Sequence, residues 1–245
     1  DGTVTITVSK GIQATVTANP ATQTITLGDG SNIVVGLSGG SGTGSISFAS
    51  SNTAVCTVDP NTGEVAIIAA GSCVITSTKA ADANYLAASA TSTLTVNKAT
   101  QATLTATKTS DTTFGNSTVV TAAAAGGSGT GTLSFASTTS GVCTVNASTG
   151  VITIVSAGSC VIRATKAADT NYLVATSDVT ITIAKASQSA VTTSTTYANT
   201  TFGDGSINTA SLSGGTGVGA ITYTSTDTSV CTVNSTTGAI TVVTA

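Results

Sequence analysis

The strongest constraint on the fold is an internal repeat with a period close to 88 residues. Cys56, Cys143 and Cys231 follow one another at intervals of 87 and 88 residues, and each opens the same triplet, Cys-Thr-Val. Other landmarks keep this spacing: Lys10, Lys98 and Lys185; "KAADANYL" at 79–86 and "KAADTNYL" at 166–173; "GGSGTG" at 39–44 and 126–131, with "GGTGVG" at 214–219. Such a period is too long for a solenoid unit and fits a small β-sandwich of about 100 residues.

The repeat divides the 245 residues into modules and parts of modules. Residues 11–98 and 99–185 are predicted to be two complete modules, and residues 186–245 an incomplete third. Residues 1–10, "DGTVTITVSK", match the segments that end both complete modules, so we expect them to be the last strand of a preceding module. In "TVNKATQATL" only about three residues separate one module from the next. Because short connections restrict hinge motion, this predicts a semi-rigid rod.

Each module is predicted to be an all-β sandwich of about seven strands. In the second module the alternating segments are 101–108, 117–123, 131–137, 142–146, 150–156, 159–166 and 177–185. Short alternating segments separated by turn residues are typical of a sandwich with one buried and one wet face per strand. Hydrophobic residues make up 40% of the chain and charged residues 7%, which argues against a disordered region.

Two pairs of cysteines, each separated by 17 residues, are expected to form structural disulfides: Cys56 with Cys73, and Cys143 with Cys160. A structural zinc site would need further soft ligands, and a redox-active pair usually takes the form Cys-x-x-Cys. The sequence contains no histidine and no Cys-x-x-Cys. Closing each loop would stabilise its module by about 3 kcal/mol in the chain-entropy model. Disulfides persist in oxidising compartments, which predicts a location outside the cytoplasm.

The fifth cysteine, Cys231, has no counterpart 17 residues further on, because that position lies beyond Ala245. We interpret Cys231 as half of a disulfide that is interrupted by the end of the sequence. The alternative is that residues 1–10 of one copy complete the open third module of another by strand donation, which would make the chain a filament subunit.

The cysteine-containing repeat resembles a known family of modules. The run "FASSNTAVCTVDPNTGEVAIIAAGSCVITSTKAADANYLAASATSTLTV" is similar to the bacterial immunoglobulin-like modules that occur in tandem in very large surface and secreted proteins. Their usual form is "SSN.AVATVD..TG.VT...AGTATITAT", and two of its alanines are cysteines here. The resemblance covers nearly the whole chain and implies an extracellular bacterial surface protein. Such modules occur in adhesins, in surface filaments including gliding-motility adhesins, and as spacers in secreted enzymes.

Composition and spacing argue against several classes of ligand. The seven basic residues are scattered and the net charge is −3, so we expect no nucleic-acid binding. No run of about 18 apolar residues occurs, so we expect no membrane insertion. "GGSGTG" lacks the Lys-Ser/Thr of a phosphate loop and is interpreted as a flexible loop between strands. Asp82, Asp169, Asp29 and Asp204 fit turns closed by the carboxylate, with calcium binding between modules as the alternative.

No catalytic constellation is found, so we predict no enzyme activity, no cofactor and no metal site. The chain has no histidine for a triad and no repeated pair of carboxylates suited to acid–base catalysis. The leading hypothesis is a stalk that projects a binding tip and bears tension, with the flanking modules of the same chain as its partners. A surface or glycan ligand would bind at a tip outside this sequence. The alternative is a spacer or carbohydrate-binding module of a secreted enzyme, although Phe48, Phe135 and Tyr223 occupy core-like positions.

Overall fold

The computed structural model describes residues 2–196, 201–203 and 208–245. The chain divides into two compact units, Asp1–Ala184 and Lys185–Ala245. The described residues form strands and turns and no helix, so no helix among them could cross a membrane. This confirms the all-β prediction.

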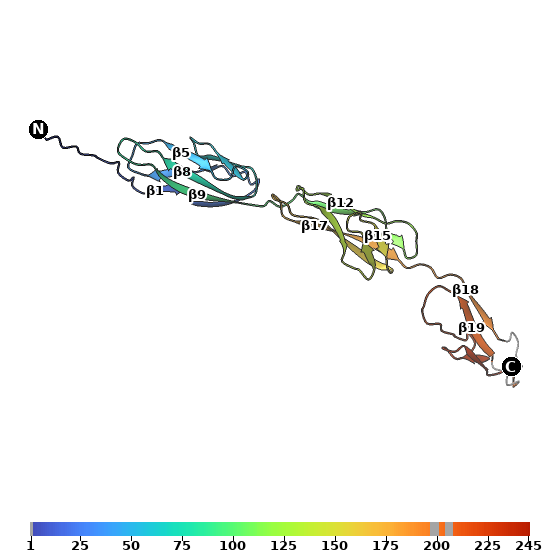
Figure 1. The fold of residues 1–245 in the computed structure, drawn as a ribbon. Helices are drawn as coiled ribbons and strands as arrows, with labels where there is room; N and C mark the ends of the chain where they lie inside the picture. The colour runs from blue at the N-terminus through green and yellow to red at the C-terminus, as the bar shows by residue number, and fades with distance from the viewer. Residues whose placement is uncertain (1, 197–200, 204–207) are drawn as a thin grey trace. The chain divides into compact units, whose positions relative to one another are not determined.

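The first unit begins with nine strands between residues 16 and 97. They are β1 (Val16–Asn19), β2 (Thr22–Thr26), β3 (Ile33–Val34), β4 (Gly36–Gly39), β5 (Ile46–Ser50), β6 (Cys56–Val58), β7 (Glu64–Ile67), β8 (Gly71–Lys79) and β9 (Ala88–Asn97). One layer is the sheet β2-β9-β8-β5, in which β2 runs parallel to β9 and the other pairs are antiparallel. The other layer contains β3-β7-β6 and the pair β1-β4, where β3 and β4 are separated only by Val35. In Figure 1, β8 and β9 run side by side through this module.

The core of this sandwich follows from the alternation along its longest strands. On β8, the side chains of Cys73, Ile75 and Ser77 are buried, while the residues between them are more exposed. On β9, Leu94 and Val96 are buried in the same way. This period of two is the geometry of a pleated strand with one face on a core. The buried cluster is Ile25, Ile33, Val35, Phe48, Val55, Cys56, Val65, Cys73, Ile75, Leu94 and Val96.

The rest of the first unit repeats this arrangement. Its strands are β10 (Leu104–Lys108), β11 (Thr112–Thr113), β12 (Ala122–Gly126), β13 (Leu133–Ser137), β14 (Cys143–Val145), β15 (Ile152–Ile154), β16 (Gly158–Lys166) and β17 (Ala175–Ala184). One layer is β11-β17-β16-β13, and the other contains the pairs β10-β12 and β14-β15. The second buried cluster is Leu104, Val120, Ala122, Phe135, Cys143, Ile152, Cys160, Ile162, Ala164, Ile181 and Ile183.

Two local features differ from the sequence-based expectation. The strand expected at 117–123 is observed as β12, after an isolated bridge between Thr121 and Val151. The Asn116 side chain accepts hydrogen bonds from the backbone N–H and the hydroxyl of Thr118, both at 2.8 Å, which holds this segment in a turn. The short strand β11, parallel to β17, was not expected, because two threonines are too few to show alternation.

The second unit contains four strands among its described residues. They are β18 (Val191–Thr195), β19 (Asn208–Gly214), β20 (Cys231–Val233) and β21 (Ala239–Val242), in the sheet order β18-β19-β21-β20. These strands correspond in the repeat to the layer that carries Cys56 and Cys143. Figure 1 labels β18 and β19 in this unit. The module boundaries at 10/11, 98/99 and 185/186 stay predictions.

Residues 2–10 carry no strand assignment in the described structure. Their apolar side chains are almost fully exposed, with Val4 at 86%, Ile6 at 80% and Val8 at 87%. The alternation of apolar and polar residues in this segment therefore does not by itself produce a strand, because a strand also needs a second strand to pair with its backbone N–H and C=O groups. The interpretation of this segment as the last strand of a preceding module stays a prediction, as does strand donation between copies.

Candidate functional site: disulfides between the sheets and clamps at the loops

Each complete sandwich is closed by a disulfide that joins its two layers. Cys56 on β6 is bonded to Cys73 on β8, with the Cα atoms 6.2 Å apart. Cys143 on β14 is bonded to Cys160 on β16, with the Cα atoms 5.6 Å apart. All four cysteines are at most 1% exposed. The disulfides therefore lie inside the core, where they tie two strands from opposite layers.

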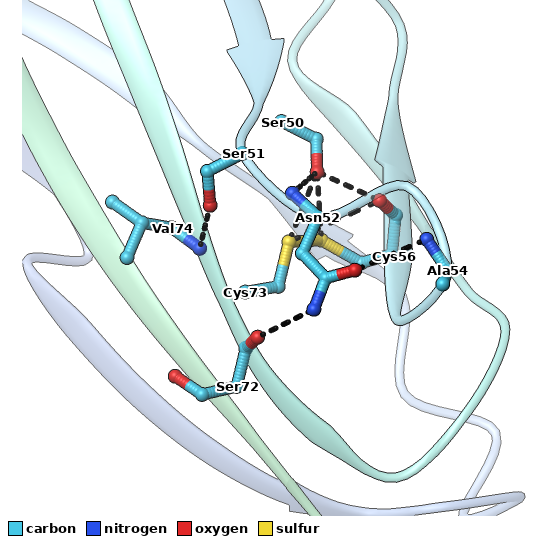
Figure 2. Close-up of a disulfide and its surroundings, with 8 residues drawn as sticks. All are labelled: Ser50, Ser51, Asn52, Ala54, Cys56, Ser72, Cys73 and Val74. Carbon is cyan, nitrogen blue, oxygen red and sulfur yellow. Dashed lines mark hydrogen bonds between the residues drawn. A yellow bond between two sulfur atoms is a disulfide. The ribbon is translucent and has the colours of Figure 1, made fainter.

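A serine hydroxyl lies directly against the first disulfide (Figure 2). The Ser50 Oγ is 3.1 Å from the Cys73 Sγ and 3.7 Å from the Cys56 Sγ. The same hydroxyl donates a hydrogen bond of 2.8 Å to the backbone carbonyl of Cys56, and it accepts one from the backbone N–H of Asn52. Ser50 thus connects the end of β5 to both bonded strands.

The loop after β5 is attached to β8 on either side of Cys73. As Figure 2 shows, the Ser51 hydroxyl accepts a hydrogen bond from the backbone N–H of Val74 at 3.1 Å. The Asn52 amide donates to the carbonyl of Ser72 at 3.4 Å, and its oxygen accepts from the N–H of Ala54. Side-chain bonds of this kind satisfy backbone groups that no strand pairing reaches.

The serine recurs in the other copies. Ser137 Oγ is 3.4 Å from Cys143 Sγ, and Ser225 Oγ is 3.6 Å from Cys231 Sγ. Sequence reasoning missed these serines, although a signal was available: each lies six residues before the cysteine that opens the Cys-Thr-Val triplet. The third copy thus has the same local arrangement around its single cysteine.

Cys231 is the one free cysteine of the described residues, and it is half-buried on β20. Its Sγ has the Ser225 hydroxyl beside it, as the bonded cysteines have their serines. The interpretation that its sulfur partner would lie 17 residues further along stays a prediction.

A second repeated feature is an aspartate that clamps two loops together. The Asp82 carboxylate accepts hydrogen bonds from the backbone N–H groups of Asn84 and Tyr85, both at 2.8 Å. Its other oxygen accepts from the backbone N–H of Thr43 at 2.6 Å, and from the Thr43 hydroxyl. The turn interpretation of this aspartate is confirmed. The additional contact joins its turn to the glycine-rich loop 39 residues earlier in the chain.

Asp169 makes the same clamp in the second module. It accepts from the backbone N–H of Thr130 at 2.6 Å, and from those of Asn171 and Tyr172 at 2.9 and 2.8 Å. Bonds from N–H groups favour the charged carboxylate. The N–H of Thr130, followed by those of Asn171 and Tyr172, therefore lowers the pKa of Asp169 from 3.8 to about 2. The equivalent bonds, led by the one from Thr43, lower the pKa of Asp82.

The glycine-rich loop lies between β4 and β5, and side-chain hydrogen bonds attach it to other segments of the module; its flexibility stays a prediction. The Gln13 side-chain oxygen accepts a hydrogen bond of 3.0 Å from the N–H of Gly42, while its amide donates to the carbonyl of Ala80. A Cβ at Gly42 would come within 2.5 Å of the Asp82 carboxylate. The motif therefore contains glycine here because the carboxylate occupies the space of a side chain.

No group of three or more His, Cys, Asp or Glu side chains that could hold a metal occurs among the described residues. Asp29 forms a turn, because its carboxylate accepts from the N–H groups of Thr26 and Ser31. Asp204 lies outside the described residues. The carboxylate oxygens of Asp29, like those of Asp82 and Asp169, accept hydrogen bonds from backbone N–H groups, which favours turns over calcium sites.

Comparison with known proteins gives one family match. Residues 35–81 match the model of the intimin immunoglobulin-like domain. This segment contains the glycine-rich loop, the first disulfide and β8. The fold is a tandem immunoglobulin-like β-sandwich.

Solved structures of low sequence identity also match. Mouse cadherin-23 repeats EC22–24 match at 15% identity over 93% of this chain and 88% of that chain, with a TM-score of 0.37. Human protocadherin-24 EC1–2 matches at 13% identity over 73% of this chain and 100% of that chain, with a TM-score of 0.33. A SusE-like surface-located polysaccharide-binding protein of Bacteroides thetaiotaomicron matches at 16% identity over 71% of this chain and 34% of that chain, with a TM-score of 0.29. No curated protein matches the sequence.

Proposed function

We propose that this chain is part of the stalk of an extracellular bacterial adhesin or surface filament, where it projects a binding tip and bears tension. The observation that carries the proposal is the repeated disulfide between the two layers of each sandwich. The match of residues 35–81 to the intimin immunoglobulin-like domain supports an adhesin-type repeat.

A stalk under tension gains from a disulfide in this position. Force on a tandem array passes along each module from its first strands to its last. The bond between Cys143 and Cys160 closes off a segment of 17 residues, and force cannot extend that segment while the bond holds. The module therefore releases less length when it unfolds, and it refolds from a shorter chain.

The main alternative, a carbohydrate-binding module, requires exposed aromatic rings on which a sugar can stack. Phe48 and Phe135 are 8% and 7% exposed and belong to the two cores. Phe114, which is 44% exposed, does not form a platform with another exposed ring of its module, because Tyr172 is half-buried. The burial of Phe48 and Phe135 favours a structural role for these two rings.

The test has two parts. An antibody against this chain should label intact, unpermeabilised cells that make the parent protein, and the purified chain should bind no sugar on a glycan array. Labelling that required permeabilisation would refute the surface location. Binding of the chain to glycans at sub-millimolar concentration would instead support the carbohydrate-binding alternative.

A gliding-motility adhesin is the more specific form of this proposal. In that case, deletion of residues 99–185 from the parent protein should impair both the movement and the attachment of the cells. Impaired attachment with normal movement would favour a static adhesin.

A further inference from the structure

The chain passes from the first sandwich to the second within two residues. The carbonyl of Asn97, the last residue of β9, accepts a hydrogen bond of 3.0 Å from the N–H of Leu27 in the first module. The N–H of Ala99 then donates to the carbonyl of Asn171 in the second module at 2.9 Å. Only Lys98 lies between these two anchored positions. The covalent joint is therefore short and fixed at both ends.

A second connection crosses the same joint through a side chain. The Asn171 Oδ1 accepts a hydrogen bond of 3.0 Å from the backbone N–H of Ala70, just before β8 of the first module. Ala70 is only 9% exposed, and Asn171 is half-buried.

The Asn171–Tyr172 loop also forms one wall of a cleft of about 450 Å³ on the first module. Its other walls are the turn at 27–31 and the end of β7. The second module has a similar cleft of about 430 Å³, formed by the equivalent turn at 114–119 and by β15. The cleft on the first module is therefore lined by residues of both modules.

We propose that this contact is a specific lock between modules, in which the Asn171 side chain fixes the second sandwich against the end of the first. A joint with one connection can pivot about Lys98. A second connection several residues away opposes that motion, because rotation would leave the N–H of Ala70 without an acceptor. The inference rests on the proposed stalk function for its biological role and on the contacts alone for its geometry.

The clamp of Asp169 positions the locking residue. Its carboxylate accepts hydrogen bonds from the backbone N–H groups of Asn171 and Tyr172. These bonds lie within the second module, so they fix the conformation of the Asn-Tyr loop independently of the contact with the first module. Asn84 is set in the same way by Asp82. Asn84 therefore provides a matched control: the same residue in the same turn, without the contact to Ala70.

The test is hydrogen exchange of the Ala70 amide by NMR in the full 245-residue chain. Asn171→Ala should accelerate this exchange by roughly two- to tenfold, as expected for the loss of one hydrogen bond. Asn84→Ala should leave it unchanged, and Asn171→Asp, which keeps an oxygen acceptor, should preserve the protection. Unchanged exchange of the Ile162 amide in the second core would show that the variants remain folded.

Residual dipolar couplings of the same samples report the stiffness of the joint. The couplings of the two modules should fit one alignment tensor in the unmodified chain and two tensors in Asn171→Ala. Unchanged Ala70 exchange in Asn171→Ala, or a single tensor in that variant, would overturn the lock. Neither result depends on where the parent protein is located, so failure of the lock is distinguishable from failure of the stalk proposal.

Discussion

Replacement of both Cys143 and Cys160 by alanine should lengthen the extension that the second module releases when it unfolds under force. The two cysteines are 17 positions apart in the sequence, but the disulfide holds their Cα atoms only 5.6 Å apart. While the bond is intact, a pulling force passes across it and cannot extend the segment that it encloses. Both cysteines are replaced so that no free thiol remains to form other pairs.

The size of the effect follows from the length of the enclosed segment. At about 3.5 Å per residue, 17 residues have an extended length of about 60 Å. Subtraction of the distance already spanned by the bond leaves an added extension of about 55 Å. The alanine variant should also unfold more readily, since loss of a loop closure of this size removes about 3 kcal/mol of stability.

Single-molecule force spectroscopy of the full chain measures this extension directly. The first module provides the control within each trace, because its bond between Cys56 and Cys73 encloses a segment of the same length. In the variant, one of the two long unfolding steps should increase and the other should not. Reductant added to the unmodified chain should lengthen both steps. Equal steps in the variant and the unmodified chain would refute the argument that the disulfide bears the load.

Two further predictions concern the clamps. Because the pKa of Asp169 is lowered to about 2, its contribution to stability is fully present above about pH 4 and is lost as the pH falls toward 2. Thermal melting between pH 2 and 6 should therefore show a weaker pH dependence for Asp169→Asn, and identical profiles would contradict the clamp. Gly42→Ala should destabilise the first module by about 1–3 kcal/mol through overpacking against Asp82, as measured by chemical denaturation. Gly141→Ala, whose Cβ would meet nothing within 4 Å, should change the midpoint little.

Much of the fold could be predicted because the alternation of apolar and polar residues recurs in each copy of the repeat, and both features follow from the need to bury one face of each strand. A strand with one face on a core must place an apolar side chain at every second position, and Cys73 and Ile75 on β8 show this pattern. The sequence also placed both cysteine pairs on inward faces. The short β11 was missed because its two residues cannot show a period, and its pairing with β17 depends on the whole sandwich.

The clamps were only partly predictable. A turn at Asp82 could be expected from the residue type, since a carboxylate readily accepts from N–H groups two and three residues further on. Its bond to Thr43 could not be expected, because it joins loops 39 residues apart and requires the two layers to be in place. The same holds for the serines beside the disulfides. These contacts join residues that are far apart in the sequence, whereas local sequence rules describe only residues that are close together along the chain.

Links other than apolar packing occur in this protein both within a core and between modules. The disulfide between β6 and β8 links the two layers inside the first core, and Ser50 extends that link to β5. Outside the core, Asp169 fixes the conformation of a loop whose Asn171 side chain contacts the neighbouring sandwich. With 3% aromatic residues, each core is small, and small cores leave modest stability to resist force. A covalent link within each module and a polar lock between modules would compensate at the two places where a tandem array fails, namely the unfolding of a sandwich and the bending of a joint.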